Sequence, residues 1–69
     1  MDNGWSIVYT VSSPITAELL RQALGEAGIT SVVINQHDSS FQSFGNVEVY
    51  VADENLEQAK EIADRFENQ

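Results

Sequence analysis

Hydrophobic and polar positions alternate along residues 5–11, a segment dense in β-branched and aromatic side chains, and this pattern predicts a strand. Successive side chains of a strand point to opposite faces, so the segment divides into two sets. One face carries Trp5, Ile7, Tyr9 and Val11, and the other carries Ser6, Val8 and Thr10. Both sets are partly apolar, so the pattern leaves open which of them meets the core.

A change to helical spacing predicts a helix over residues 14–27. Ser13 is expected to cap its start, because a serine hydroxyl can accept an unpaired amide hydrogen, and Pro14 suits the first helical position. Gly28 stands where helices often end in a left-handed residue. Gly25, inside the helix, costs about 1 kcal/mol relative to alanine and suggests either close packing or simple drift. The apolar stripe expected to face the core consists of Ile15, Leu19, Leu20, Ala23, Leu24 and Ala27.

Two further strands are predicted at residues 30–35 and 47–51. The first of these is rich in β-branched residues. The second alternates three valines with Glu48 and Tyr50, which is typical of a strand with one buried face. We therefore expect the valines to face the core and the other two side chains to lie on an open face.

A second helix is predicted over residues 54–67, with Asp53 as its N-terminal cap. Glu61 and Arg65 are four positions apart, which places them one turn apart on the helix and predicts a weak surface ion pair. The apolar stripe of this helix consists of Leu56, Ala59, Ile62, Ala63 and Phe66.

The order strand–helix–strand–strand–helix predicts a single α+β domain over residues 1–69. The first helix joins two strands that should be parallel, since such crossovers are right-handed within one sheet. The third strand fits between them, antiparallel to both, and gives a three-stranded sheet of order 1-3-2. With both helices on one face, this is a ferredoxin-like plait that lacks its final strand. The first strand then forms an edge that carries neither lysine nor proline to discourage pairing.

Charge narrows the class of partner. Eleven acidic residues stand against three basic ones, for a formal net charge of −8, so nucleic acid and anionic membranes are disfavoured as partners. The chain has no cysteine, which excludes disulfides and thiolate metal sites and fits a reducing cytoplasm. No apolar run approaches the ~20 residues that span a bilayer. We therefore expect a cytoplasmic protein.

The sequence offers little for catalysis. His37 beside Asp38 is a weak set of metal ligands, since adjacent side chains rarely converge on one ion. No serine lies in a nucleophile elbow, and so short a chain can hardly enclose a substrate pocket. We therefore expect no catalytic residue, no metal, no cofactor and no enzymatic activity.

The segment 36–46 is longer than the roughly two to five residues that a hairpin needs. Either its side chains form hydrogen bonds with its own backbone and its phenylalanines anchor it, or it forms a binding loop. The residues of this candidate loop are Asn35, His37, Asp38, Ser39, Ser40, Phe41 and Phe44.

Two other candidate sites follow from the pattern. Ser12 and Ser13 precede a helix whose free amides could hold an anion, although capping alone explains them. The open sheet face and the unprotected edge favour self-association, since a small domain gains stability from a homodimer. The candidate residues of that interface are Trp5, Tyr9, Glu48 and Tyr50.

Several segments resemble one bacterial family. They are Tyr9-Thr10, Ala17-Glu18-Leu19-Leu20, Glu26-Ala27-Gly28-Ile29, Asn35, Asp38-Ser39-Ser40-Phe41, Phe44-Gly45 and Val47-Glu48-Val49-Tyr50-Val51. Together they resemble the small prokaryotic signal-transducing proteins called domain of unknown function two-thousand-seven, most closely the versions from Bacteroidetes. Those versions often carry lysines where this chain has Gln36-His37. The resemblance implies a plait related to the nitrogen-sensing PII proteins and a role in signalling, and it supplies no catalytic residues.

These observations favour a non-enzymatic binding or regulatory module that acts through contacts with a protein partner, which the sequence does not identify. The alternative is a sensor of a small ligand or anion that uses the 36–46 loop and the start of the first helix. An enzyme is a remote third alternative.

Overall fold

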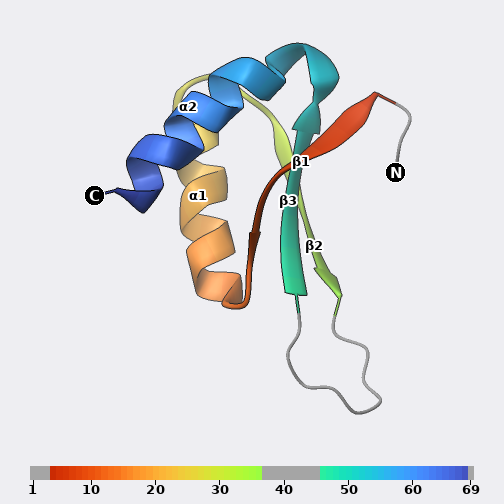
Figure 1. The fold of residues 1–69 in the computed structure, drawn as a ribbon, viewed down its shortest axis with the longest axis vertical. Coiled ribbons are helices and arrows are strands. Elements are labelled where there is room, and N and C mark those ends of the chain that lie inside the picture. The colour runs from red at the N-terminus through yellow and green to blue at the C-terminus, as the bar shows by residue number, and fades with distance from the viewer. Residues whose placement is uncertain (1–3, 37–45, 69) are drawn as a thin grey trace.

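A computed structural model describes residues 4–36 and 46–68 of the chain. Its elements follow the order that the sequence predicts, and they lie in two layers (Figure 1). They are β1 (Trp5–Val11), α1 (Pro14–Glu26), β2 (Ser31–Gln36), β3 (Asn46–Ala52), a short 3-10 turn η1 (Asp53–Asn55) and α2 (Leu56–Glu67).

The three strands form one sheet of order β1-β3-β2. The central strand β3 is antiparallel to both neighbours, so β1 and β2 are parallel to each other. Figure 1 shows both helices on the same side of this sheet. The predicted α+β fold and sheet order are therefore confirmed, and the other face of the sheet has no layer of described residues over it.

Val47, Val49 and Val51 occupy the centre of the core, with at most 1% of each side chain exposed. They alternate with Glu48 and Tyr50 on β3, so the prediction that the valines point toward the helices is confirmed. The other buried residues are Ala17, Leu20, Leu24, Ile29, Ala59 and Ala63.

A β-bulge in β1 overturns the prediction that Trp5, Ile7, Tyr9 and Val11 share one face of that strand. The pairing with β3 shifts register between Ile7 and Tyr9, and Val8 is the extra residue. Residues directly opposite each other in an antiparallel pair share a face. Trp5 and Ile7 therefore lie on the open face, opposite Ala52 and Tyr50. After the bulge, the core face holds the side chains of Tyr9 and Val11, opposite Val49 and Val47.

The apolar stripe predicted for α1 is also partly wrong. Ala17, Leu20 and Leu24 are fully buried, whereas Ile15 is 72% exposed and Leu19 is 51% exposed. Consecutive residues lie about 100° apart around a helix axis, so Leu19 and Leu20 cannot both face the sheet. The helix packs through the stripe that begins at Ala17 and leaves a second apolar stripe turned outward.

The end of α1 follows the predicted left-handed glycine pattern. Gly28 has a φ angle of +83°. Its amide donates to the carbonyl of Gly25 at 3.0 Å, and the amide of Ile29 donates to the carbonyl of Leu24 at 2.9 Å. These two bonds satisfy carbonyls that the helix leaves unpaired, and they turn the chain toward β2.

Alanine substitutions at the two glycines of this helix end should have opposite effects. A Cβ added at Gly25 meets nothing within 4 Å, so close packing does not explain this glycine, and Gly25→Ala should stabilise the protein by about 0.5–1 kcal/mol. Gly28→Ala forces a side chain into the left-handed region and should destabilise it by about 1 kcal/mol. Urea denaturation of both variants measures the difference, and equal effects of the same sign would contradict it.

Asp53 does not cap α2, contrary to the prediction. Its side chain accepts a hydrogen bond from the Ser6 hydroxyl at 2.5 Å, and its amide donates to the carbonyl of Gly4 at 2.8 Å. The pairing of β3 with β1 continues to Ala52, which brings Asp53 beside the start of β1. Asn55 precedes α2 instead and makes no side-chain capping bond.

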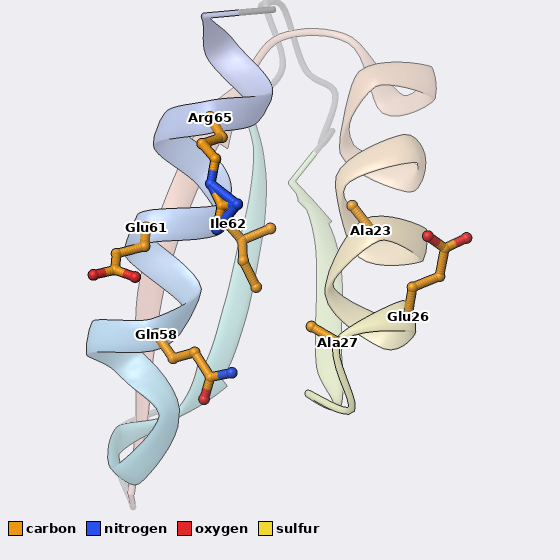
Figure 2. Close-up of a pocket in the computed structure, with 7 residues that line it drawn as sticks. All are labelled: Ala23, Glu26, Ala27, Gln58, Glu61, Ile62 and Arg65. Carbon is orange, nitrogen blue, oxygen red and sulfur yellow. The ribbon is translucent and has the colours of Figure 1, made fainter.

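The core stripe of α2 agrees with the prediction, but the surface ion pair does not form. Ala59 and Ala63 are buried, and the larger apolar side chains of the stripe pack partly buried around them. Within residues 4–36 and 46–68, Arg65 makes no ion pair. The carboxylate of Glu61 points away from it (Figure 2).

Candidate functional site

The candidate site is the open face of the sheet, on the side away from the two helices (Figure 1). Its members come from all three strands, and their faces follow from the pairing registers. They are Trp5, Ile7 and Thr10 of β1, Val32 and Ile34 of β2, and Glu48, Tyr50 and Ala52 of β3.

This face is predominantly apolar. Ile7 is 44% exposed, and Trp5 and Tyr50 are half-buried. Glu48 is the one charged residue that the described strands place here, and its carboxylate accepts a hydrogen bond from the Tyr50 hydroxyl at 3.0 Å. An apolar sheet surface with a single charge is typical of a protein contact and not of a solvated surface.

The structure brings together three of the four predicted interface residues. Trp5, Glu48 and Tyr50 lie on the open face. Tyr9 lies on the opposite face, where its ring packs edge-on against Phe66 of α2, with 6.3 Å between the ring centroids. Tyr9 therefore belongs to the packing between sheet and helix, because the bulge at Val8 separates it from Trp5.

Sequence reasoning missed three apolar residues of this face, Ile7, Val32 and Ile34. The segment that became β2 has apolar residues in both alternating sets, so its pattern does not distinguish the two faces. Only the register with β3 distinguishes the two faces of β2, since Val32 pairs with Tyr50 and Ile34 pairs with Glu48. The strand order and the strict alternation of β3 are the signals that could have located them.

The candidate loop is described at one position. Asn35 is exposed near the end of β2 and pairs with Val47, which places it on the helix side of the sheet. The remaining predicted loop residues, His37, Asp38, Ser39, Ser40, Phe41 and Phe44, lie outside the described residues.

Ser13 is the N-cap that the sequence predicts. Its hydroxyl accepts a hydrogen bond from the amide of Thr16 at 3.4 Å, and its carbonyl accepts one from the amide of Ala17 at 3.1 Å. Ser12 is exposed beside it. The Ser13 hydroxyl oxygen therefore already accepts a capping hydrogen bond.

Replacing each serine by alanine separates capping from anion binding. Ser13→Ala should lower the free energy of unfolding by about 1 kcal/mol, because an amide of the first turn loses its acceptor, whereas Ser12→Ala should change it little. Thermal unfolding with and without inorganic phosphate measures both effects. If phosphate stabilises the wild-type chain and neither variant, the serines form an anion site as well as a cap.

A groove of about 390 Å³ separates the two helices on the other side of the molecule (Figure 2). Its apolar surface comes from Ala23 of α1, from Ala27 directly after α1 and from Ile62 of α2. Its polar lining comes from Glu26, Gln58, Glu61 and Arg65.

One ion pair lies on the exposed side of α1. The guanidinium of Arg21 contacts the carboxylate of Glu18 one turn earlier. This hydrogen bond lowers the pKa of Glu18 below its usual value and raises that of Arg21. Both side chains are close to half-exposed, so solvent screens the pair and it adds little to stability.

The described residues contain neither a group of metal ligands nor a membrane-spanning helix. Within that part of the chain, no three histidine, cysteine, aspartate or glutamate side chains are grouped so that they could hold a metal ion. No helix in it has the length and apolar character needed to cross a membrane.

The fold and its bare sheet face define a small two-layer α+β module. The model of a family described as "Putative prokaryotic signal transducing protein", a domain of unknown function, matches residues 5–67. This match spans every strand and helix given above, so the chain belongs to that family, and the predicted resemblance is confirmed. The family description indicates signal transduction. No significant match was found among curated proteins or among solved structures.

Proposed function

We propose that this chain is a non-enzymatic regulatory module of signal transduction that acts through protein–protein contacts, the first of them with a second copy of itself. The observation that carries the proposal is the open sheet face. There Trp5, Ile7 and Tyr50 lie side by side on neighbouring strands, with one charged residue among them. Removing such a surface from water is the main source of favourable energy in association.

The distribution of charge favours a second copy as the occupant. The helices and the 3-10 turn carry eight acids and three bases, a net charge of −5, whereas the described strands carry only Glu48. Two copies that meet through their sheets keep the two acidic helical layers on the outside and far apart. Like charges brought together at an interface oppose association, so contact through the helical layers is disfavoured.

The size of the face predicts a weak dimer. Three strands about 4.8 Å apart and six or seven residues long span roughly 14 by 23 Å, or at most about 330 Å² for each copy. Side chains increase the accessible area, but the total is still at or below the ~1,200 Å² typical of a specific interface. We therefore expect the dimer population to change with protein concentration.

Trp5 makes the proposal directly testable, because it is the one tryptophan of the chain and lies on the open face. Light scattering across a wide concentration range should show the mass rising from monomer to dimer. The emission of Trp5 should shift to shorter wavelength over the same range, because its indole leaves water. A constant monomer mass with unchanged emission at the highest concentration would refute self-association through this face.

A further inference from the structure

The outward stripe of α1 is the most exposed apolar feature of the described residues. Ile15 is 72% exposed and Leu19 is 51% exposed, one turn apart on the same side of the helix. Ala23 and Ala27 continue the same row at intervals of four residues. Large apolar side chains held in water on a helix surface cost free energy, and a partner that covers them recovers it.

This row leads into the groove between the helices. Ala23 of α1 and Ala27 directly after it form one wall of the 390 Å³ groove, and Ile62 faces them from α2 (Figure 2). The alanines are too short to fill the space between the helices, so the groove is open to side chains from outside. The apolar residues of the row and of the groove therefore form one surface, which we call the α1 ridge (Ile15, Leu19, Ala23, Ala27 and Ile62).

Acidic residues outnumber basic ones on the helical layer that carries the α1 ridge. Glu26 and Glu61 line the groove against the single base Arg65. The helical layer as a whole carries eight acids and three bases, and one of those bases, Arg21, is already paired with Glu18. The negative charge disfavours a second copy on this side and attracts a positively charged partner.

We infer that the α1 ridge binds an amphipathic helix of a partner protein, with apolar side chains at i, i+3, i+4 and i+7 and with lysine or arginine flanking them. The apolar anchors would cover Ile15 and Leu19 and enter the groove, and the basic flank would meet the acids on its rim. This site lies on the face opposite the proposed dimer contact, so the inference goes beyond the proposed function and does not depend on it.

A pair of synthetic peptides tests this inference. The first contains only leucine, at helical spacing, and lysine; the second keeps the leucines and replaces every lysine by glutamate. Added to the full chain, the lysine peptide should shift the amide resonances of the α1 ridge, and added salt should weaken its binding. The double variant Ile15→Ser, Leu19→Ser should raise its dissociation constant at least about tenfold, because two apolar contacts are lost.

Ile7→Ser serves as the matched control, since it removes an exposed apolar residue from the opposite face and should leave peptide affinity unchanged. Equal binding of the glutamate peptide, shifts confined to the open sheet face, or unchanged affinity of the double variant would each overturn the inference. Light scattering of the same samples without peptide reports dimerisation, so the two proposals succeed or fail separately.

Discussion

Replacing Leu20 by alanine should unfold a large fraction of the protein. Leu20 is fully buried where α1 packs on the sheet, and truncating such a leucine costs about 2–5 kcal/mol through lost burial and the cavity left behind. A chain this short has a total stability of only a few kcal/mol, so the loss is comparable with the whole. Urea denaturation followed by circular dichroism should show a midpoint near zero denaturant.

Leu19→Ala is the matched control, since it makes the same chemical change one position away. Leu19 is 51% exposed, so its truncation should alter the free energy of unfolding by no more than about 0.5 kcal/mol. Similar losses for the two variants would show that α1 meets the sheet through a different stripe. A larger loss for Leu19→Ala than for Leu20→Ala would also show that α1 meets the sheet through a different stripe.

The element order and the central strand could be predicted because each has a strong local signal. Ser13 and Pro14 mark the start of α1, Gly28 marks its end, and the alternating valines of β3 fix which face is buried. The strand order then follows from the short connections and the preferred crossover. Neither inference needs information about how one element contacts another.

The predictions that proved wrong concern residues for which the local sequence fits two arrangements equally well. At these residues only a contact between two elements decides which arrangement forms. Leu19 and Leu20 are both suitable core residues, and only the seating of α1 on the sheet selects Leu20. The bulge at Val8 is defined by the pairing of β1 with β3, and the composition of β1 does not indicate it. Asp53 has a good capping side chain, but the strand pairing brings Ser6 within its reach first.

The candidate site on the open face could also be predicted only in part. Glu48 and Tyr50 follow from the alternation of β3, and Trp5 lies where the sheet order places β1. The bulge moves Tyr9 to the other face. Val32 could not be assigned to the open face from the sequence, because both faces of β2 contain apolar residues. A face built by three strands can be read from sequence only as far as the register of each pair is known.

Lysine in place of Ile7 should abolish self-association. Ile7 is an exposed apolar residue of the open face, and a two-fold interface buries each substituted position twice. Because 44% of Ile7 is exposed, each of the two contacts contributes about 0.7–1.3 kcal/mol, so losing both raises the dissociation constant at least about tenfold, and the two buried lysines add a desolvation cost. Sedimentation velocity should therefore show a monomer at concentrations where the wild-type chain is a dimer. Leu19→Lys is the control, because its exposure is similar and it lies on the helical side, so the dimer should persist. If both lysine variants dissociate alike, the contact is not made by the sheet face, and if neither does, the open face is not the interface.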